Sequence, residues 1–212
     1  MTSSRISVWN IAGILAPICY TVAVLLGGAL TPGYSHLRHP ISSLTQTGAV
    51  GIASVHALFF AYNLLMMVFS AGFWLRMRKT GRKMAAGGFL LLLAVGLAGV
   101  LMFWFTQDPI GAPLTFRGLG HLVLAGVEAF GTMAGCILCG LGIRNVPGCS
   151  TLSTFSIVSA LVIFVSGGAN VATIGINPYF GLVERLTIFT FLIWMFVMAS
   201  CFSAAPTPRR TV

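Results

Sequence analysis

Three acidic residues and four histidines are the side chains of this sequence that could carry acid–base or metal chemistry. They are Asp108, Glu128, Glu184, His36, His39, His56 and His121. Carboxylates and imidazoles transfer protons near neutral pH, and both bind divalent metal ions. Glu128 is the most informative of them because it stands inside a long apolar run. If that run crosses a membrane, an ionisable group there is costly and marks a candidate functional site.

The residues around Glu128 extend it into a polar stripe. His121 lies seven residues before it and Thr132 four residues after it, so all three fall on one helical face. Gly135 lies on the same face and permits close packing. We therefore expect the stripe to face the interior of a helix bundle, with a polar partner for Glu128 on another helix. Two interpretations stay open: a water-filled cavity, or a protonated Glu128 that is hydrogen-bonded to a neighbouring helix.

A loop at residues 34–48 carries the second group of candidates. These are His36, Arg38, His39 and Ser42. Leu37, Ile41 and Leu44 recur at helical spacing, which predicts a short amphipathic helix on the rim of the bundle. Loops of this length are usually functional or disordered. The alternative is a lid without chemistry, whose hydroxyl groups only cap helices.

Six apolar segments must position these side chains. The sequence is 57% hydrophobic and 7% charged, whereas soluble domains carry about 25% charged residues. A membrane-spanning helix needs about 20 mainly apolar residues. The segments that qualify cover residues 8–30, 52–75, 85–106, 118–142, 152–174 and 183–204. Because unpaired strand edges cannot face lipid, we predict an all-α, six-transmembrane-helix bundle that forms a single domain over residues 1–212.

Small residues on the third and fourth segments predict where helices approach each other closely. They are Gly96, Gly99, Gly131 and Gly135. Lipid supplies no hydrophobic drive for helix association, so close backbone packing takes its place. We expect these glycines to lie between helices of one bundle rather than at a dimer face.

The placement of lysine and arginine sets the expected orientation. Five basic residues crowd positions 76–83, and short loops rich in Lys and Arg stay in the cytoplasm. Both termini are then cytoplasmic, and Arg38, Arg117 and Arg185 lie outside with all four histidines. The net charge is +9, but no basic groove or stacking motif accompanies it, which excludes a nucleic-acid binder. We expect a multi-pass protein of the cell membrane, the plasma membrane of a bacterium, with lipid as its partner.

Metal or haem chemistry is one class of function that the outer residues fit. A membrane-embedded, metal-dependent lipid hydrolase needs about three protein ligands and an open water position. Its ligands would be His36, His39, His121 and Asp108. Glu128 or Glu184 would be the general base. A haem protein would instead use His56 and His121 as axial ligands.

Functions without a cofactor are the other class. A small transporter or lipid-handling protein would relay protons or bind a cation through Glu128. A structural or accessory subunit would use the outer charges for ion pairs such as Asp108–Arg117 and Glu184–Arg38. Buried ion pairs are weak evidence even for stability.

Four short stretches carry a family resemblance. They are His36–Leu44 followed by Gly48, Asp108-Pro109, Gly120-His121, and Glu184–Leu186. Through them the sequence resembles the domain of unknown function 998 family of bacterial and archaeal multi-pass membrane proteins. The resemblance implies a six-helix membrane bundle and transfers no activity or catalytic residue. It singles out the same outer loops as the charge pattern.

The hypothesis that these observations favour is an outward-facing polar cavity for a lipid or a small molecule. Its candidate binding residues are His36, Arg38, His39, Ser42, Arg117 and Arg185. If the cavity carries catalysis, the candidates are Glu128, His121, Asp108 and Glu184. The hydrolase ranks second and the haem protein third, so a divalent metal is the first cofactor to consider.

Overall fold

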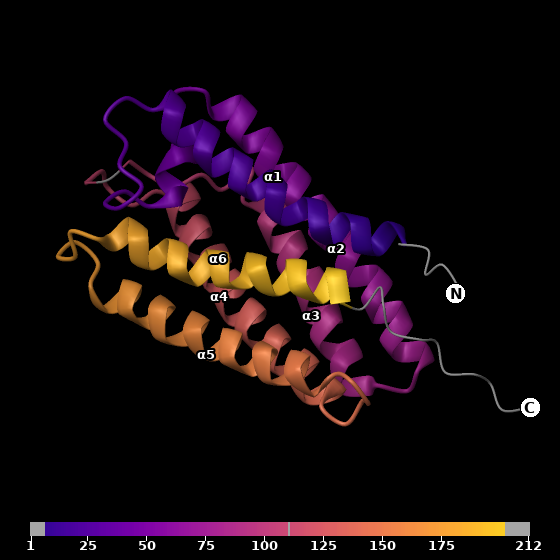
Figure 1. Ribbon diagram of the computed structural model, residues 1–212. Helices are drawn as coiled ribbons and strands as arrows, with labels where there is room; N and C mark the ends of the chain where they lie inside the picture. The colour runs from indigo at the N-terminus through magenta and orange to yellow at the C-terminus, as the bar shows by residue number, and fades with distance from the viewer. Residues whose placement is uncertain (1–6, 110, 202–212) are drawn as a thin grey trace, which may run out of the picture.

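Six long helices and one short helix make up the computed structural model, which describes residues 7–109 and 111–201. The long helices are α1 (Val8–Leu30), α2 (Ile52–Lys79), α3 (Lys83–Leu101), α4 (Phe116–Ile143), α5 (Ser150–Ala172) and α6 (Phe180–Cys201) (Figure 1). A short 3-10 helix, η1 (Ile41–Thr45), lies between α1 and α2. All six long helices are long and apolar enough to cross a membrane, and the described residues contain no strand. The predicted all-α membrane bundle is confirmed.

α3 ends at Leu101 and not at residue 106 as predicted. Beyond it the chain makes tight turns, in which the Phe105 N–H donates to the Met102 carbonyl at 3.2 Å. Such i→i+3 bonds wind the chain more tightly than the α-helix does. The turns bring the Phe105 carbonyl to within 3.1 Å of the His121 ring on α4.

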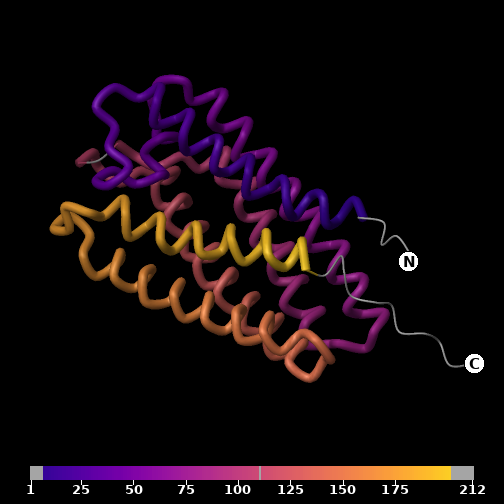
Figure 2. Tube along the Cα trace, in the orientation of Figure 1, coloured from indigo at the N-terminus to yellow at the C-terminus, as the bar shows by residue number. Residues whose placement is uncertain are grey.

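The six long helices close into a ring. Each packs against the next one in sequence, and α6 packs back against α1. Figures 1 and 2 show the α1–α2 pair on one side and the α5–α6 pair on the other, with α3 and α4 behind. We call the end with the basic residues 76–83 the basic end. The opposite end, with the connections 31–51, 102–115 and 173–179, is the loop end.

The two halves of the ring are packed differently. In the basic half, a large core gathers side chains from all six helices, among them Phe69, Phe89 and Trp194. A smaller core near the loop end contains Ala23, Val24, Ile41, Leu44 and Val55. On α4 no residue from 119 to 130 is buried, and on α6 none from 182 to 190 is buried. The half nearest the loop end is therefore more loosely packed along α4 and α6.

The predicted close-packing glycines do lie between helices of the ring. A Cβ added to Gly135 of α4 would lie 2.6 Å from the side chain of Leu92 on α3. A Cβ on Gly99 of α3 would overlap the side chain of Asn63 on α2. The other two glycines approach the same neighbouring helices just as closely, so this prediction is confirmed.

Aromatic side chains mark both ends of the ring. Trp104 and Tyr179 are exposed at the loop end, and Trp9 is exposed at the basic end. At the basic end, the Arg78 guanidinium also lies 4.8 Å above the ring of Trp74. Trp and Tyr concentrate at membrane–water interfaces, so these residues agree with a bilayer around the middle of the ring.

Candidate functional site

Arg185 is the centre of the contacts that hold the first loop against α6. Its Nη1 donates to the carbonyl oxygens of Gly181 at 2.8 Å and of His39 at 3.0 Å. Its Nη2 donates to the Tyr34 hydroxyl at 2.5 Å and to Nδ1 of His36 at 3.2 Å. We name the set formed by Tyr34, His36, His39, Glu184 and Arg185 the loop clamp. The guanidinium that was predicted to bind a ligand is thus engaged by the protein itself.

The Glu184 side chain holds the same loop by binding the backbone of the loop. One carboxylate oxygen accepts a hydrogen bond from the Ile41 N–H at 2.5 Å. The Asn170 side chain of α5, with its amide oriented as its neighbours require, accepts from the Glu184 N–H at 2.9 Å and donates to the Phe180 carbonyl at 3.3 Å. Glu184 therefore fixes the first loop, while Asn170 ties α5 to the first turns of α6.

Both loop histidines accept hydrogen bonds in the clamp. Because arginine only donates, Nδ1 of His36 must accept from Arg185. Nδ1 of His39 accepts from the Ser35 N–H at 2.9 Å. The proton of each neutral ring therefore lies on Nε2. Burial, and then the Arg185 charge, lower the pKa of His36, whereas burial raises the pKa of Tyr34.

The predicted amphipathic helix of the first loop is shorter than expected. Only Ile41–Thr45 is helical, and it is a 3-10 helix. Ile41 and Leu44 are buried as predicted, but Leu37 is 50% exposed, so its predicted place on the apolar face is wrong. The Leu37 carbonyl instead accepts from the Leu182 N–H at 3.0 Å. The loop is thus fixed by its backbone as much as by its apolar side chains.

Three predicted binding residues lie apart from the clamp. Arg38 and Arg117 are exposed, and their side chains make no hydrogen bond within the described residues. The expected ion pairs of Arg38 with Glu184 and of Arg117 with Asp108 are wrong for this part of the chain. Each carboxylate accepts from N–H or O–H groups instead. Ser42 is half-buried in η1.

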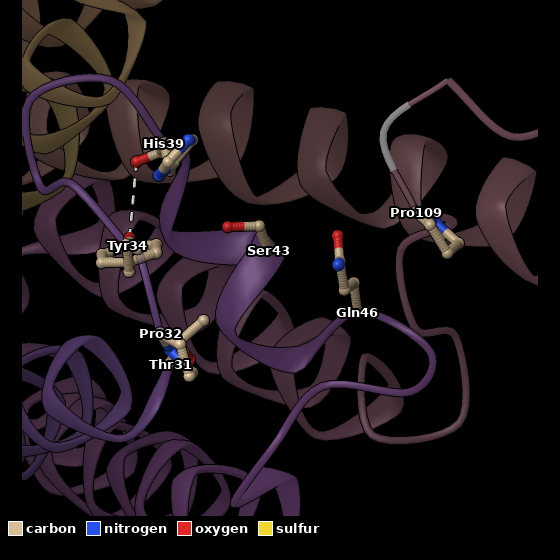
Figure 3. Close-up of a pocket in the computed structure, with 8 residues that line it drawn as sticks. Thr31, Pro32, Tyr34, His39, Ser43, Gln46 and Pro109 are labelled. Atoms are coloured by element: carbon tan, nitrogen blue, oxygen red, sulfur yellow. Dashed lines mark hydrogen bonds between the residues drawn. The ribbon is translucent and has the colours of Figure 1, made fainter.

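An open pocket lies beside η1 at the loop end, as Figure 3 shows. Its volume is about 280 Å³, and it is lined by Thr31, Pro32, Gly33, Tyr34, His39, Ser43, Gln46 and Pro109. Seven of these residues belong to the first loop, and Pro109 comes from the α3–α4 connection. The lining includes the predicted His39, and it includes Ser43 in place of the predicted Ser42. It contains no acidic residue, lysine or arginine.

Asp108 and His121 fix the α3–α4 connection. The Asp108 carboxylate accepts from the N–H and the hydroxyl of Thr115, each at 2.8 Å. Thr115 in turn accepts from the Gly118 N–H at 3.1 Å and so caps α4. Nδ1 of His121 lies 3.1 Å from the Phe105 carbonyl, which requires the ring to donate. Both residues thus have structural partners.

The structure does not gather the predicted metal ligands into one place. In residues 7–109 and 111–201, no three His, Cys, Asp or Glu side chains lie close enough to hold one metal ion. The loop histidines belong to the clamp, whereas Asp108 and His121 belong to the α3–α4 connection. His56 packs against the ring of Phe103, with ring centroids 5.3 Å apart. The hydrolase and haem alternatives stay predictions.

Glu128 points into the ring. The exposed large apolar residues in the first half of α4 form one arc: Phe116, Leu119, Leu122, Val123, Val127 and Phe130. At about 100° per residue, Glu128 and His121 fall on the opposite arc. The Glu128 carboxylate lies near Tyr20 of α1 and Tyr62 of α2. It is half-buried and has no hydrogen bond among the described residues, so the polar partner that was predicted on another helix is not found.

Sequence reasoning missed Tyr34 and Gln46 among the residues of the loop end. Both are uncharged, whereas all the predicted site residues except Ser42 are charged side chains or histidines. Tyr34 could have been found as an aromatic residue in a polar loop directly after a spanning segment, because a tyrosine hydroxyl usually finds a partner when buried. Gln46 carries no comparable signal in one sequence.

Acidification will loosen the loop clamp through His36. Protonation of Nδ1 removes the hydrogen bond from Arg185 and sets two positive charges together. Since the pKa of His36 is lowered in the folded protein, its contribution to stability is complete above the unfolded pKa of about 6.5. It is lost as the pH falls through that value toward the lower folded pKa.

Limited proteolysis of residues 31–51 measures this effect. Cleavage should speed up between about pH 7 and about pH 5. His39 and Glu184 belong to the same clamp, so a His36→Gln variant, whose amide oxygen still accepts from Arg185, is the control and should show a flatter pH profile. Equal pH profiles of cleavage for the wild type and His36→Gln would show that protonation of His36 does not loosen the loop clamp.

Comparison with known proteins agrees with a membrane bundle. A family model described as "Protein of unknown function (DUF998)" matches residues 14–200. The chain is also similar to the SPbeta prophage-derived UPF0715 membrane protein YopD of Bacillus subtilis (strain 168), with 28% identity over 82 residues. That match covers 39% of this chain and 63% of the relative, so it spans less than two thirds of the relative's length. No solved structure matches the chain.

Proposed function

The chain belongs to the DUF998 family of multi-pass membrane proteins, and from that premise we propose that it binds a lipid or a small molecule in a polar cavity of its outward-facing half. In this proposal the loop end is the outward side, because the basic residues 76–83 lie at the other end. Glu128 is the observation that carries the proposal. Its carboxylate points into the ring, is half-buried, and has no hydrogen bond among the described residues.

An unpaired carboxylate at membrane depth costs several kcal/mol, roughly 2.5–3.5 on insertion scales. A ligand with a cationic or hydrogen-bond-donating group would supply the partner that Glu128 lacks. The loosely packed faces of residues 119–130 on α4 and 182–190 on α6 leave accessible apolar surface in the same half of the ring. A membrane lipid or another amphiphile has both a polar group for Glu128 and an apolar part for these faces.

Carboxyl labelling of the purified full chain tests the proposal. Dicyclohexylcarbodiimide is apolar and reaches carboxyl groups from the lipid phase, and the described chain has only three side-chain carboxyls to compare. Peptide mass spectrometry should place its adduct on Glu128. Asp108, which faces the connection outside the spanning helices, should react with a water-soluble carbodiimide instead. Adding back the lipid extract of the host membrane should protect Glu128 from the apolar reagent.

Glu128→Gln is the matched variant for this experiment. It keeps the shape of the side chain and removes the reactive group, so it should lose the adduct and retain its thermal midpoint. Native mass spectrometry should then show fewer retained lipid molecules than for the wild type. If the reagent labels Glu184 and leaves Glu128 unlabelled, the proposal that Glu128 is accessible inside the ring is wrong.

A further inference from the structure

The pocket beside η1 carries an inference that goes beyond the proposed function, because Glu128 is not among its lining residues. Two of its side chains end in buried oxygen atoms without a partner: Thr31 Oγ1 and Gln46 Oε1. Only four such atoms occur in residues 7–109 and 111–201, so two of them lie at one pocket. Proteins pair nearly all buried polar atoms with protein, water or ligand. This concentration distinguishes the pocket from the rest of the described surface and motivates a search for a hydrogen-bonding ligand there.

The other polar groups of the lining show what chemistry such a molecule needs. Ser43 donates its proton to the Pro40 carbonyl at 2.7 Å, which leaves its oxygen as an acceptor. Nδ1 of His39 accepts from Ser35, so Nε2 of the neutral ring is a donor. The pocket therefore mixes donors with acceptors, and hydroxyl groups satisfy both kinds at once.

The charge and shape of the pocket narrow the class of ligand further. The lining has no acidic residue, lysine or arginine, so it offers no counterion for a charged ligand. Pro32, Pro109 and the Tyr34 ring supply apolar wall on which the C–H face of a saturated ring packs (Figure 3). The volume of about 280 Å³ is just below the range of roughly 300–1,000 Å³ for drug-sized ligands. It suits one ring rather than an extended chain.

We infer that this pocket binds a neutral, hydroxyl-rich ring, a hexose either free or as the head group of a glycolipid. The Tyr34 wall is held in place by its hydrogen bonds to Arg185 and to the Pro40 carbonyl. The site is therefore formed before the ligand arrives, and binding needs little rearrangement of the loop.

Saturation-transfer difference NMR on the full chain measures binding of the free sugar. The protein is purified in lauryldimethylamine N-oxide, because a detergent with a sugar head group would occupy the pocket. The probe is methyl β-D-glucoside, with a dissociation constant expected on the order of 1 mM, typical of a few neutral hydrogen bonds. A second arm uses nanodiscs with or without monoglucosyl diacylglycerol in a phosphatidylglycerol bilayer.

Two variants remove groups from the pocket, and one matched variant does not. Ser43→Ala and Gln46→Leu should each weaken binding roughly two- to tenfold, the equivalent of one neutral hydrogen bond. Gln46→Leu removes an unpartnered oxygen, so it should leave the thermal midpoint unchanged or raised. Ser42→Ala changes the neighbouring serine in η1, which does not line the pocket, and should bind as the wild type does.

The two arms separate the sources of the sugar. Binding of both probes, weakened by the pocket variants, supports a free sugar as ligand, and binding of the glycolipid alone supports a lipid head group. Binding to phosphatidylglycerol nanodiscs that is independent of the glycolipid would overturn the inference in favour of a charged ligand. It is also overturned if neither probe binds, or if Ser42→Ala weakens binding as much as Ser43→Ala. Carbodiimide labelling of Glu128 does not depend on any of these results.

Discussion

Replacing Arg185 with methionine will release the first loop from α6. Methionine fills a similar volume but cannot donate to the carbonyls of Gly181 and His39, to Tyr34 or to His36. Hydrogen bonds from a charged group contribute about 1.5–3 kcal/mol each and are not additive, so we expect a loss of about 3 kcal/mol. The thermal midpoint should fall, and protease should cleave residues 31–51 faster than in the wild type.

Arg38→Met is the matched control for this variant. Arg38 lies on the same loop, but its side chain is exposed and makes no hydrogen bond within the described residues. Its replacement should leave both readouts within error of the wild type. Arg185→Lys keeps the charge but not the planar fork, so it should recover only part of the stability. A loop that stays equally protected in Arg185→Met would refute the loop clamp.

Gly88→Leu will unfold much of the α3–α4 interface, whereas Gly87→Leu will be tolerated. A Cβ at Gly88 would lie 2.7 Å from Sγ of Cys139 and 2.9 Å from the backbone atoms Cys139 N and Gly135 O. Backbone cannot move aside without separating the helices, so the cost should reach about 3 kcal/mol, the upper end for overpacking. A Cβ at the adjacent Gly87 meets nothing within 4 Å.

Unfolding of both variants in detergent, followed by circular dichroism, compares them directly. The two substitutions place the same side chain on neighbouring residues of one helix, so helix propensity and added hydrophobicity are matched. The difference between their midpoints therefore reports the α3–α4 contact alone. Similar midpoints for the two variants would mean that α3 and α4 do not pack through Gly88.

Much of the fold could be predicted because it depends on local features of the sequence. Long apolar runs require spanning helices, and the predicted starts differ from the observed ones by at most three residues, as with residue 183 against Phe180. Close-packing glycines could be predicted for the same reason, since small side chains have one main use between helices in lipid. The end of α3 could not be predicted in this way. The turns after Leu101 place the Phe105 carbonyl against His121 of α4, which follows later in the sequence.

The site was harder to predict because its groups pair with backbone. Charge complementarity suggested Arg38 for Glu184, yet the Glu184 carboxylate accepts from the Ile41 N–H. Arg185 likewise uses two carbonyl oxygens. Every residue has an N–H or C=O group, so the amino-acid types give no indication of such a pairing. The inward direction of Glu128 was predictable because helix periodicity alone sets it.

The closed ring also sets the order of events during synthesis. The first loop is fixed by α6, and the bond between Ile41 and Glu184 joins residues that are 143 positions apart. At about 5–20 residues per second, the ribosome needs roughly 7–30 s between making the loop and making its anchor. During that interval α1 has no partner on its α6 side, and the loop lacks the partners that Glu184 and Arg185 supply. A chain that stops before residue 180 would insert five helices and never form the loop clamp, so the last helix decides when the clamp forms.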